Sequence, residues 1–256
     1  MQDILRLAVS GTYSTGKSTT TEALSLLTGV PRTHALTARE ILMDLVPGKQ
    51  MQELNALELQ AVGLRRFEER VHNEAAEHGS FISDGSVLHE WVYSQIRLEV
   101  GINPGAGWLH RTTKAIVGAP VKPLFQGFTD SYAKVVKSRA KRTYDAYVHL
   151  PVEFPMHKDG HRPVSERFRN ASDKLLLDTL DELQIPYHVV GGSMQERLEK
   201  IVSIFEMPVV RPVDEAVQMA KARVAEGIEI LQADQRYHDA QRRKSTWRRI
   251  KYALRY

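Results

Sequence analysis

The feature that most constrains the fold is the stretch LRLAVSGTYSTGKSTTT at residues 5–21. An apolar run from Leu5 to Val9 precedes the pattern G-x-x-x-x-G-K-S at 11–18, and a helix-forming segment at 18–27 follows it. Strand, glycine-rich loop and helix in this order are the context in which the pattern binds phosphate. The alternative interpretation is an accidental glycine-rich turn, which the flanking strand and helix disfavour.

Each residue type in this loop has a chemical reason. Gly11 and Gly16 allow backbone turns that a Cβ would oppose, so successive N–H groups can point inward at phosphate oxygens. The positive end of the following helix adds to this attraction. We expect Lys17 to reach the β- and γ-phosphates and the Ser18 hydroxyl to ligate Mg²⁺. The predicted nucleotide-binding residues are Gly11, Thr12, Ser14, Thr15, Gly16, Lys17, Ser18 and Thr19.

The order of apolar strands and amphipathic helices predicts the α/β class, with a parallel sheet covered by helices on both faces. The segment 101–128 is rich in glycine and proline, so we expect an irregular insertion there. Downstream helices are expected at 130–143 and 172–183. A boundary near 208 divides a core domain, 1–207, from a helical C-terminal extension, 208–256.

Composition narrows the function classes. The 256 residues suffice for one α/β domain with extensions, and the absence of cysteine excludes disulfides, thiolate metal sites and a thiol nucleophile. The ten histidines show no metal-ligand spacing. No stretch approaches 18 apolar residues and no secretory signal is visible, so we expect a cytoplasmic protein without a transmembrane segment.

The extension ends in a basic tail. Residues 242–256 hold seven Lys and Arg and no acid, so the remaining 241 residues carry −3 of the total net charge of +4. Trp247, Ile250 and Leu254 share one face of a helix. We favour docking of this helix on the acidic body or in a homo-oligomer over binding of nucleic acid or anionic lipid, because its apolar face is short.

Asp84 ends the apolar strand FISD at 81–84. Ligands of parallel sheets bind beyond the carboxyl ends of the strands, so this carboxylate is placed to hold Mg²⁺ or to accept the proton of an attacking hydroxyl. The alternative is that it caps the helix that follows.

A polar, arginine-rich connection at 153–170 is a candidate lid. Arg162, Arg167 and Arg169 could close over a nucleotide and offset the charge of a transferring phosphoryl group. The alternative is a solvated loop. Trp91, Tyr93 and Trp108 are either core residues or the lining of an acceptor pocket.

These motifs together resemble the small P-loop kinases of the nucleoside and nucleotide kinase type, in particular the ribosylnicotinamide-kinase-like domain. The matching segments cover about residues 5–206 and are GTYSTGKST, TAREIL, FISDGS, YDAYVHLP, DGHR and VVGGSMQERLEKI. The resemblance implies a P-loop NTPase fold, ATP and Mg²⁺ as cofactors, and transfer of the γ-phosphoryl group to a small-molecule acceptor. It also implies catalytic roles for Lys17, Asp84 and the arginines of the lid.

The chain departs from this family at two places. Many relatives have an arginine after the strand-end acid, where this chain has Gly85. The segment 101–128 and the residues from 208 onward have no counterpart. Two other functions compete with a small-molecule kinase: a P-loop ATPase switch, and a nucleic-acid-processing kinase that uses the basic tail. The chain lacks the N-K-x-D and D-x-x-G patterns of GTPases.

Overall fold

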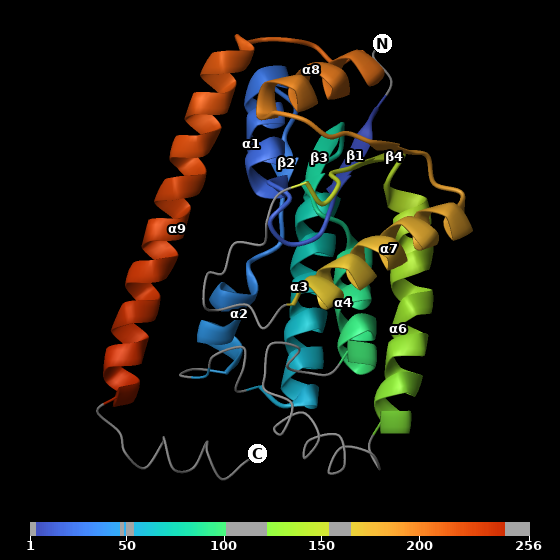
Figure 1. Ribbon diagram of the computed structural model, residues 1–256, viewed down its shortest axis with the longest axis vertical. Coiled ribbons are helices and arrows are strands. Elements are labelled where there is room, and N and C mark those ends of the chain that lie inside the picture. Colours follow the sequence, from blue (N-terminus) through green and yellow to red (C-terminus); the bar gives the residue numbers. More distant parts are fainter. Residues whose placement is uncertain (1–3, 47–48, 50–53, 101–121, 154–164, 244–256) are drawn as a thin grey trace.

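The computed structural model describes residues 4–46, 49, 54–100, 122–153 and 165–243. They form a parallel sheet with the strand order β2-β3-β1-β4-β5 (Figure 1). The strands are β1 Arg6–Ser10, β2 Arg32–Thr33, β3 Phe81–Asp84, β4 Ala146–His149 and β5 Tyr187–Val189. The predicted α/β class with a parallel sheet is confirmed.

Helices follow the strands along the chain. They are α1 Lys17–Thr28, α2 Ala38–Leu45, α3 Ala56–Ala76, α4 Val87–Val100, α6 Lys122–Thr143, α7 Glu166–Leu183, α8 Met194–Ile204 and α9 Val213–Arg243. None of these helices is long and apolar enough to cross a membrane, as judged on the described part of the chain.

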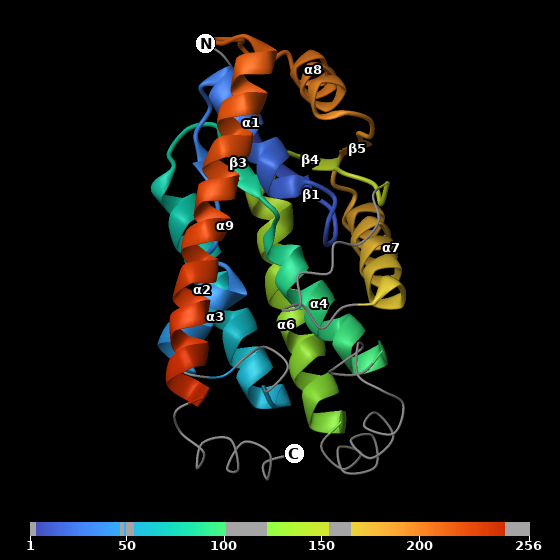
Figure 2. The ribbon, with the colours of Figure 1, turned by 60° about the vertical axis from the view of Figure 1, so that its left-hand side comes forward.

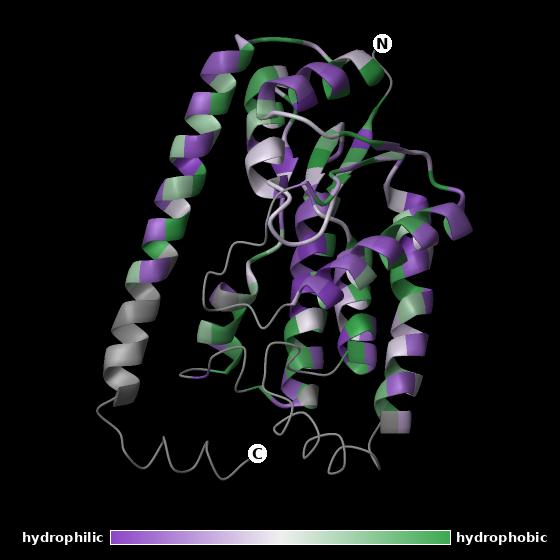
Figure 3. Cartoon of the chain, viewed as in Figure 1, coloured by the Kyte–Doolittle hydropathy of each residue, from purple (hydrophilic) through white to green (hydrophobic). Residues whose placement is uncertain are grey.

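Successive side chains of the central strand β1 point to opposite faces of the sheet, and each face is covered by its own apolar core. Leu7 and Val9 of β1 face α1, α8 and the start of α9, whereas Ala8 between them faces α4, α6 and α7. In Figure 2, α8 lies above the strands and α4, α6 and α7 lie below them. The strands β1 and β3 are coloured mainly as hydrophobic in Figure 3, as expected for strands that are buried on both faces.

Helix α6 begins earlier than the sequence predicts. Residues 122–128, which we expected to be irregular, form its first two turns. Pro123 lies in the first helical turn, where its missing N–H has no intrahelical partner in any case, so it starts the helix rather than breaking it. The other residues of the predicted insertion, 101–121, lie outside the described residues.

Helix α7 also begins earlier than predicted, at Glu166 rather than at 172. The side chain of Ser165 accepts a hydrogen bond from the backbone N–H of Phe168 at 3.2 Å and caps the first turn. Residues 166–170 of the predicted lid are therefore helical, and the charged residues of this segment belong to an amphipathic first turn rather than to a loop.

The C-terminal extension contains α9, which confirms its helical character. Its first turns pack on α1 and α8, and Ala216, Val217 and Ala220 are buried in the same core as Leu27. Further along, Ile228 and Ile230 are exposed, and Figure 1 shows α9 running the length of the molecule. The tail helix with Trp247, Ile250 and Leu254 lies outside the described residues, so its docking stays a prediction.

Candidate active site

The carboxyl ends of the central strands meet at one edge of the sheet. The parallel register pairs Val9 of β1 with Asp84 of β3, and Ser10 with His149 of β4. The chain leaves β1 at this edge, forms the loop 11–16 and enters α1 at Lys17. The structure thus brings the predicted phosphate-binding loop beside the end of the strand that carries Asp84.

The loop backbone requires its glycines. Gly11 has φ +142°, and a Cβ there would lie 2.8 Å from Thr15 Oγ1 and 2.9 Å from the carbonyl oxygen of Leu150. Gly16 has φ +82° and is the N-cap of α1. The Thr15 hydroxyl donates to the carbonyl of Thr12 at 3.1 Å and closes the turn. Side chains at either glycine would be strained or would clash.

The N-terminus of α1 has no capping side chain. Helices α2, α3 and α8 have complete capping boxes, with a glutamate in the first turn of each. In contrast, α1 has no side-chain cap and no acid in its first turn. No acid within α1 therefore offsets the positive end of its dipole, a condition that favours an anion at this position.

Asp84 lies beside two residues of α1. Its Oδ1 is 3.8 Å from Lys17 Nζ, and a hydrogen bond from Ser18 also acts on its carboxylate. A second cation, Arg32 of β2, approaches Asp84 Oδ2 with Nη2 at 2.6 Å. Burial raises the pKa of Asp84, but Lys17 and Arg32 outweigh it and hold that pKa well below its usual range. The contacts of this carboxylate come from α1 and β2 rather than from α4, which is not the geometry of a helix cap.

Arg32 is a site residue that the sequence does not reveal. It is anchored on α1, where Nε donates to Thr21 Oγ1 at 3.1 Å and Nη1 to Glu22 Oε2 at 3.2 Å. Its strand, β2, has only two residues, and no motif marks it. The one available signal is that β2 ends at the same edge of the sheet as β1 and β3.

The ionised Asp84 and the Ser18 hydroxyl fit a Mg²⁺ ion. Both are hard oxygen donors, and they are the residues that the sequence predicts as metal ligands. Mg²⁺ in kinase sites takes one or two protein ligands and completes its shell with phosphates and water. The described residues contain no cluster of three or more His, Cys, Asp or Glu side chains that could hold a metal ion.

His89 of α4 contacts the first residue of the phosphate-binding loop. Its Nδ1 accepts from the backbone N–H of Ser86 at 3.0 Å, which leaves the proton on Nε2, 3.2 Å from the carbonyl oxygen of Gly11. Burial and the nearby charge of Lys17 lower the pKa of His89 well below its ordinary value. His89 is therefore neutral and holds one end of the loop.

A buried charge cluster adjoins Gly85. Arg66 Nε donates to Glu90 Oε2 at 2.8 Å, and Arg70 Nη2 lies 3.7 Å from Glu90 Oε1. A Cβ at Gly85 would lie 3.2 Å from Arg70 Nη2, so a guanidinium from α3 fills the space beside this glycine. These charged side chains lie next to Gly85, the residue that follows Asp84.

Aromatic rings join the loop to α4 and α7. Tyr13 of the loop stacks on Tyr93 with ring centroids 4.8 Å apart, and Phe168 lies 6.1 Å from Tyr13. Tyr93 thus touches the predicted site, whereas Trp91 is buried in the core. Trp108 lies outside the described residues.

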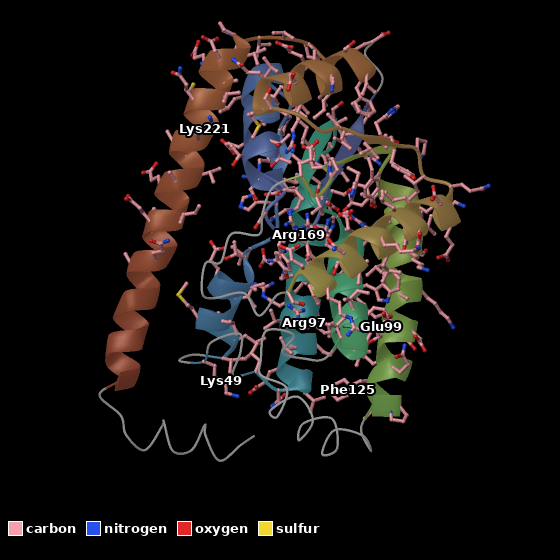
Figure 4. All side chains as sticks on the ribbon, in the orientation of Figure 1. Lys49, Arg97, Glu99, Phe125, Arg169 and Lys221 are labelled. Atoms are coloured by element: carbon pink, nitrogen blue, oxygen red, sulfur yellow. The ribbon has the colours of Figure 1, made fainter. Side chains whose placement is uncertain are left out.

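The arginines predicted for the lid have different positions. Arg169 is 1% exposed; its Nη1 lies 3.6 Å from Glu166 Oε1, and its Nε and Nη2 have no hydrogen-bond partner among the described residues. It lies next to Phe168, which contacts the loop residue Tyr13, and Figure 4 shows it near the N-terminal end of α7. Arg167 is exposed on the same turn, and Arg162 lies outside the described residues.

A phosphate-binding loop between β1 and α1 of a parallel sheet, with an acid at the end of the neighbouring strand, defines a P-loop nucleotide-binding protein with the fold of the nucleoside and nucleotide kinases. The model of the AAA domain family matches residues 6–197, and the chain belongs to this family. No curated protein sequence matches it.

Solved structures of deoxyadenosine kinase from M. mycoides are similar in fold. The complex with dATP has a TM-score of 0.56 and 15% identity over 79% of this chain and 100% of that chain. The complex with the products dCMP and dCDP has a TM-score of 0.54 and 12% identity over 79% and 98% of the two chains. The complex with dCTP has a TM-score of 0.52 and 14% identity over 79% and 99%.

Proposed function

We propose that the protein is an ATP-dependent kinase that transfers the γ-phosphoryl group to a hydroxyl of a small, nucleoside-like acceptor. The observation that carries this proposal is the approach of Lys17 and Ser18 to Asp84 at the N-terminus of α1. The same edge of the sheet thus offers a phosphate cradle and a carboxylate. The likeness of the fold to deoxyadenosine kinase supports a nucleoside-like acceptor.

In this proposal the loop N–H groups and Lys17 bind the β- and γ-phosphates. Ser18 and Asp84 would hold Mg²⁺, which would supply positive charge to offset that of the phosphates. Asp84 orients the acceptor hydroxyl and accepts its proton as the phosphoryl group is transferred. Arg169, whose Nε and Nη2 have no hydrogen-bond partner among the described residues, supplies a guanidinium to the transferring phosphoryl group.

Acceptor-dependent ADP formation tests the proposal. Purified protein with ATP and Mg²⁺ is incubated with a panel of nucleosides, nucleoside monophosphates and other polyols, and each reaction is compared with an acceptor-free control. We expect at least one panel member to raise ADP formation tenfold or more. A burst of hydrolysis that no panel member changes would instead support the ATPase switch.

A further inference from the structure

A buried arginine, 182 positions further along the chain, holds the side of the phosphate-binding loop toward which the Thr15 carbonyl points, here called its outer side. Arg197 of α8 is 1% exposed, and its Nη1 donates to the backbone carbonyl of Thr15 at 2.7 Å. The contact joins residues that are 182 positions apart. A Cβ at Gly16 would lie 3.4 Å from the same nitrogen, so Arg197 packs directly against the loop.

This contact fixes the direction of a neighbouring N–H group. In a trans peptide the carbonyl of Thr15 and the N–H of Gly16 point in opposite directions. A carbonyl held outward by Arg197 therefore turns the Gly16 N–H inward. The next peptide is fixed by α1, because the carbonyl of Gly16 accepts from the Thr20 N–H at 2.9 Å and from its hydroxyl at 3.0 Å. Both peptide units around Gly16 are thereby oriented before any phosphate arrives.

Arg197 is itself held by Glu153. The second terminal nitrogen, Nη2, lies 2.7 Å from Glu153 Oε2, and this carboxylate also accepts from the backbone N–H of Gly192 at 3.1 Å. The hydrogen bond from Arg197, followed by that from Gly192, lowers the pKa of Glu153. Glu153 comes directly before the segment 154–164, and Gly192 comes directly before the cap of α8. One guanidinium thus connects the loop with two further segments at the carboxyl edge of the sheet.

We propose that Arg197 is a positioning residue that holds the phosphate-binding loop in its phosphate-accepting conformation, with Glu153 as its anchor. The proposal deepens the proposed function and rests on it, because it assumes that the loop binds a nucleotide. Arg197 reaches the outer side of the loop and acts on phosphate through the backbone. Its removal should therefore weaken binding of any polyphosphate, with or without a base.

The test compares two ligands by calorimetry: ATP with Mg²⁺, and inorganic tripolyphosphate with Mg²⁺. The variants are Arg197→Ala, Arg197→Lys and Glu153→Gln. Lys174→Ala is the matched control, since Lys174 is an exposed cation on α7 whose ion pair is with Asp178 on the same helix. Melting temperatures are recorded for each protein, and affinities are measured well below them.

We expect Arg197→Ala to raise the Kd of both ligands by about tenfold or more, in equal proportion, because a buried charge-assisted hydrogen bond to the loop is lost. Arg197→Lys should lie between Arg197→Ala and wild type, since an ammonium can reach only part of the two-pronged contact. Glu153→Gln removes the charge of the anchor and should raise both Kd values by less than Arg197→Ala does, whereas Lys174→Ala should change each Kd less than threefold.

A rise in the Kd of ATP with an unchanged Kd of tripolyphosphate would overturn the proposal, because Arg197 would then act on the base or ribose. A lower melting temperature with both Kd values unchanged would overturn it in favour of a merely structural arginine. If Arg197→Ala does not fold, Arg197→Lys carries the same comparison. If the wild-type protein binds neither ligand, both the proposed function and the inference are refuted. If the wild-type protein binds both ligands and the Arg197 variants bind them equally well, only the inference is refuted.

Discussion

Replacement of Asp84 by asparagine separates the chemical from the structural role of this carboxylate. Asp84→Asn keeps the shape of the side chain but leaves Lys17 and Arg32 without their common anion. Removal of one partner from a buried ion pair costs about 3–5 kcal/mol. Lys17 and Arg32 are 21% and 19% exposed, and Arg32 keeps its contact with Glu22. We therefore expect a smaller loss of about 2 kcal/mol in the free energy of unfolding.

For a chain of this size, a loss of about 2 kcal/mol corresponds to a melting temperature lower by about 4–8 °C. Turnover should fall by about 100-fold or more, because the variant loses both the proton acceptor and an ionised metal ligand. Thermal melting gives the change in melting temperature. The change in turnover is measured as ADP formation with the best acceptor, at a temperature where the variant is fully folded.

The double variant Arg32→Gln/Asp84→Asn is the control for this reasoning. It removes one of the unpaired cations, so it should regain part of the stability that Asp84→Asn loses, while turnover stays low. An Asp84→Asn protein with lowered stability and full turnover would refute the catalytic role. An unchanged melting temperature would refute the charge-pair argument.

Three further predictions follow from the site and its supports. The buried, neutral His89 has a lowered pKa in the folded protein, so its contribution to stability is present above its unfolded pKa of about 6.5 and is lost as the pH falls below that value, by up to about 1.4 kcal/mol per pH unit. In urea unfolding at pH 7.5 and 5.5, His89→Gln should therefore lose less stability on acidification than wild type. An equal loss in the two proteins would contradict this reasoning. Gly11→Ala should weaken ATP binding in calorimetry by tenfold or more, because the new Cβ would clash with Thr15 Oγ1 and the carbonyl oxygen of Leu150. An unchanged affinity for ATP would show that the loop tolerates a Cβ at this position. Truncation after Glu206 should lower the melting temperature far more than truncation after Arg243, because only the shorter chain loses the buried start of α9, and equal melting temperatures would argue against this packing.

The sequence predicts those parts of the site that local chemistry specifies. The loop at 11–18 is contiguous, and its glycines, lysine and serine each have one physical reason to be there. Asp84 is predictable because an apolar strand of a parallel sheet must end at the ligand-binding edge. The structure brings these two segments together, as the register of β1 and β3 shows.

The residues that reach the site from a distance leave no such signal. Arg32 belongs to a two-residue strand, and Arg197 contacts the loop from 182 positions away. Their side chains matter only because the sheet order brings β2 and α8 next to α1. No short sequence pattern indicates that proximity, so the contacts of Arg32 and Arg197 could not be predicted from the sequence and are seen only in the structure.

Two helix starts differ from the predicted ones for another reason. The glycine- and proline-rich composition predicts an irregular segment around Pro123, although a proline is compatible with a first helical turn. The charge of residues 166–169 predicts a loop, yet Phe168 and Arg169 are buried there and only Glu166 and Arg167 are exposed. In both segments the overall composition is typical of a loop, whereas the position of each residue along the chain is compatible with a helix.

The most direct test of the central claim follows the γ-phosphoryl group itself. ATP labelled with radioactive phosphorus at the γ-position is incubated with wild-type protein or with Lys17→Ala, in the presence of the acceptor that the panel identifies. The account predicts that label moves to the acceptor with wild-type protein and that transfer falls by orders of magnitude in a folded Lys17→Ala protein, because the main cationic contact to the phosphates is lost. Label that appears only as inorganic phosphate, or equal transfer by the two proteins, would contradict it.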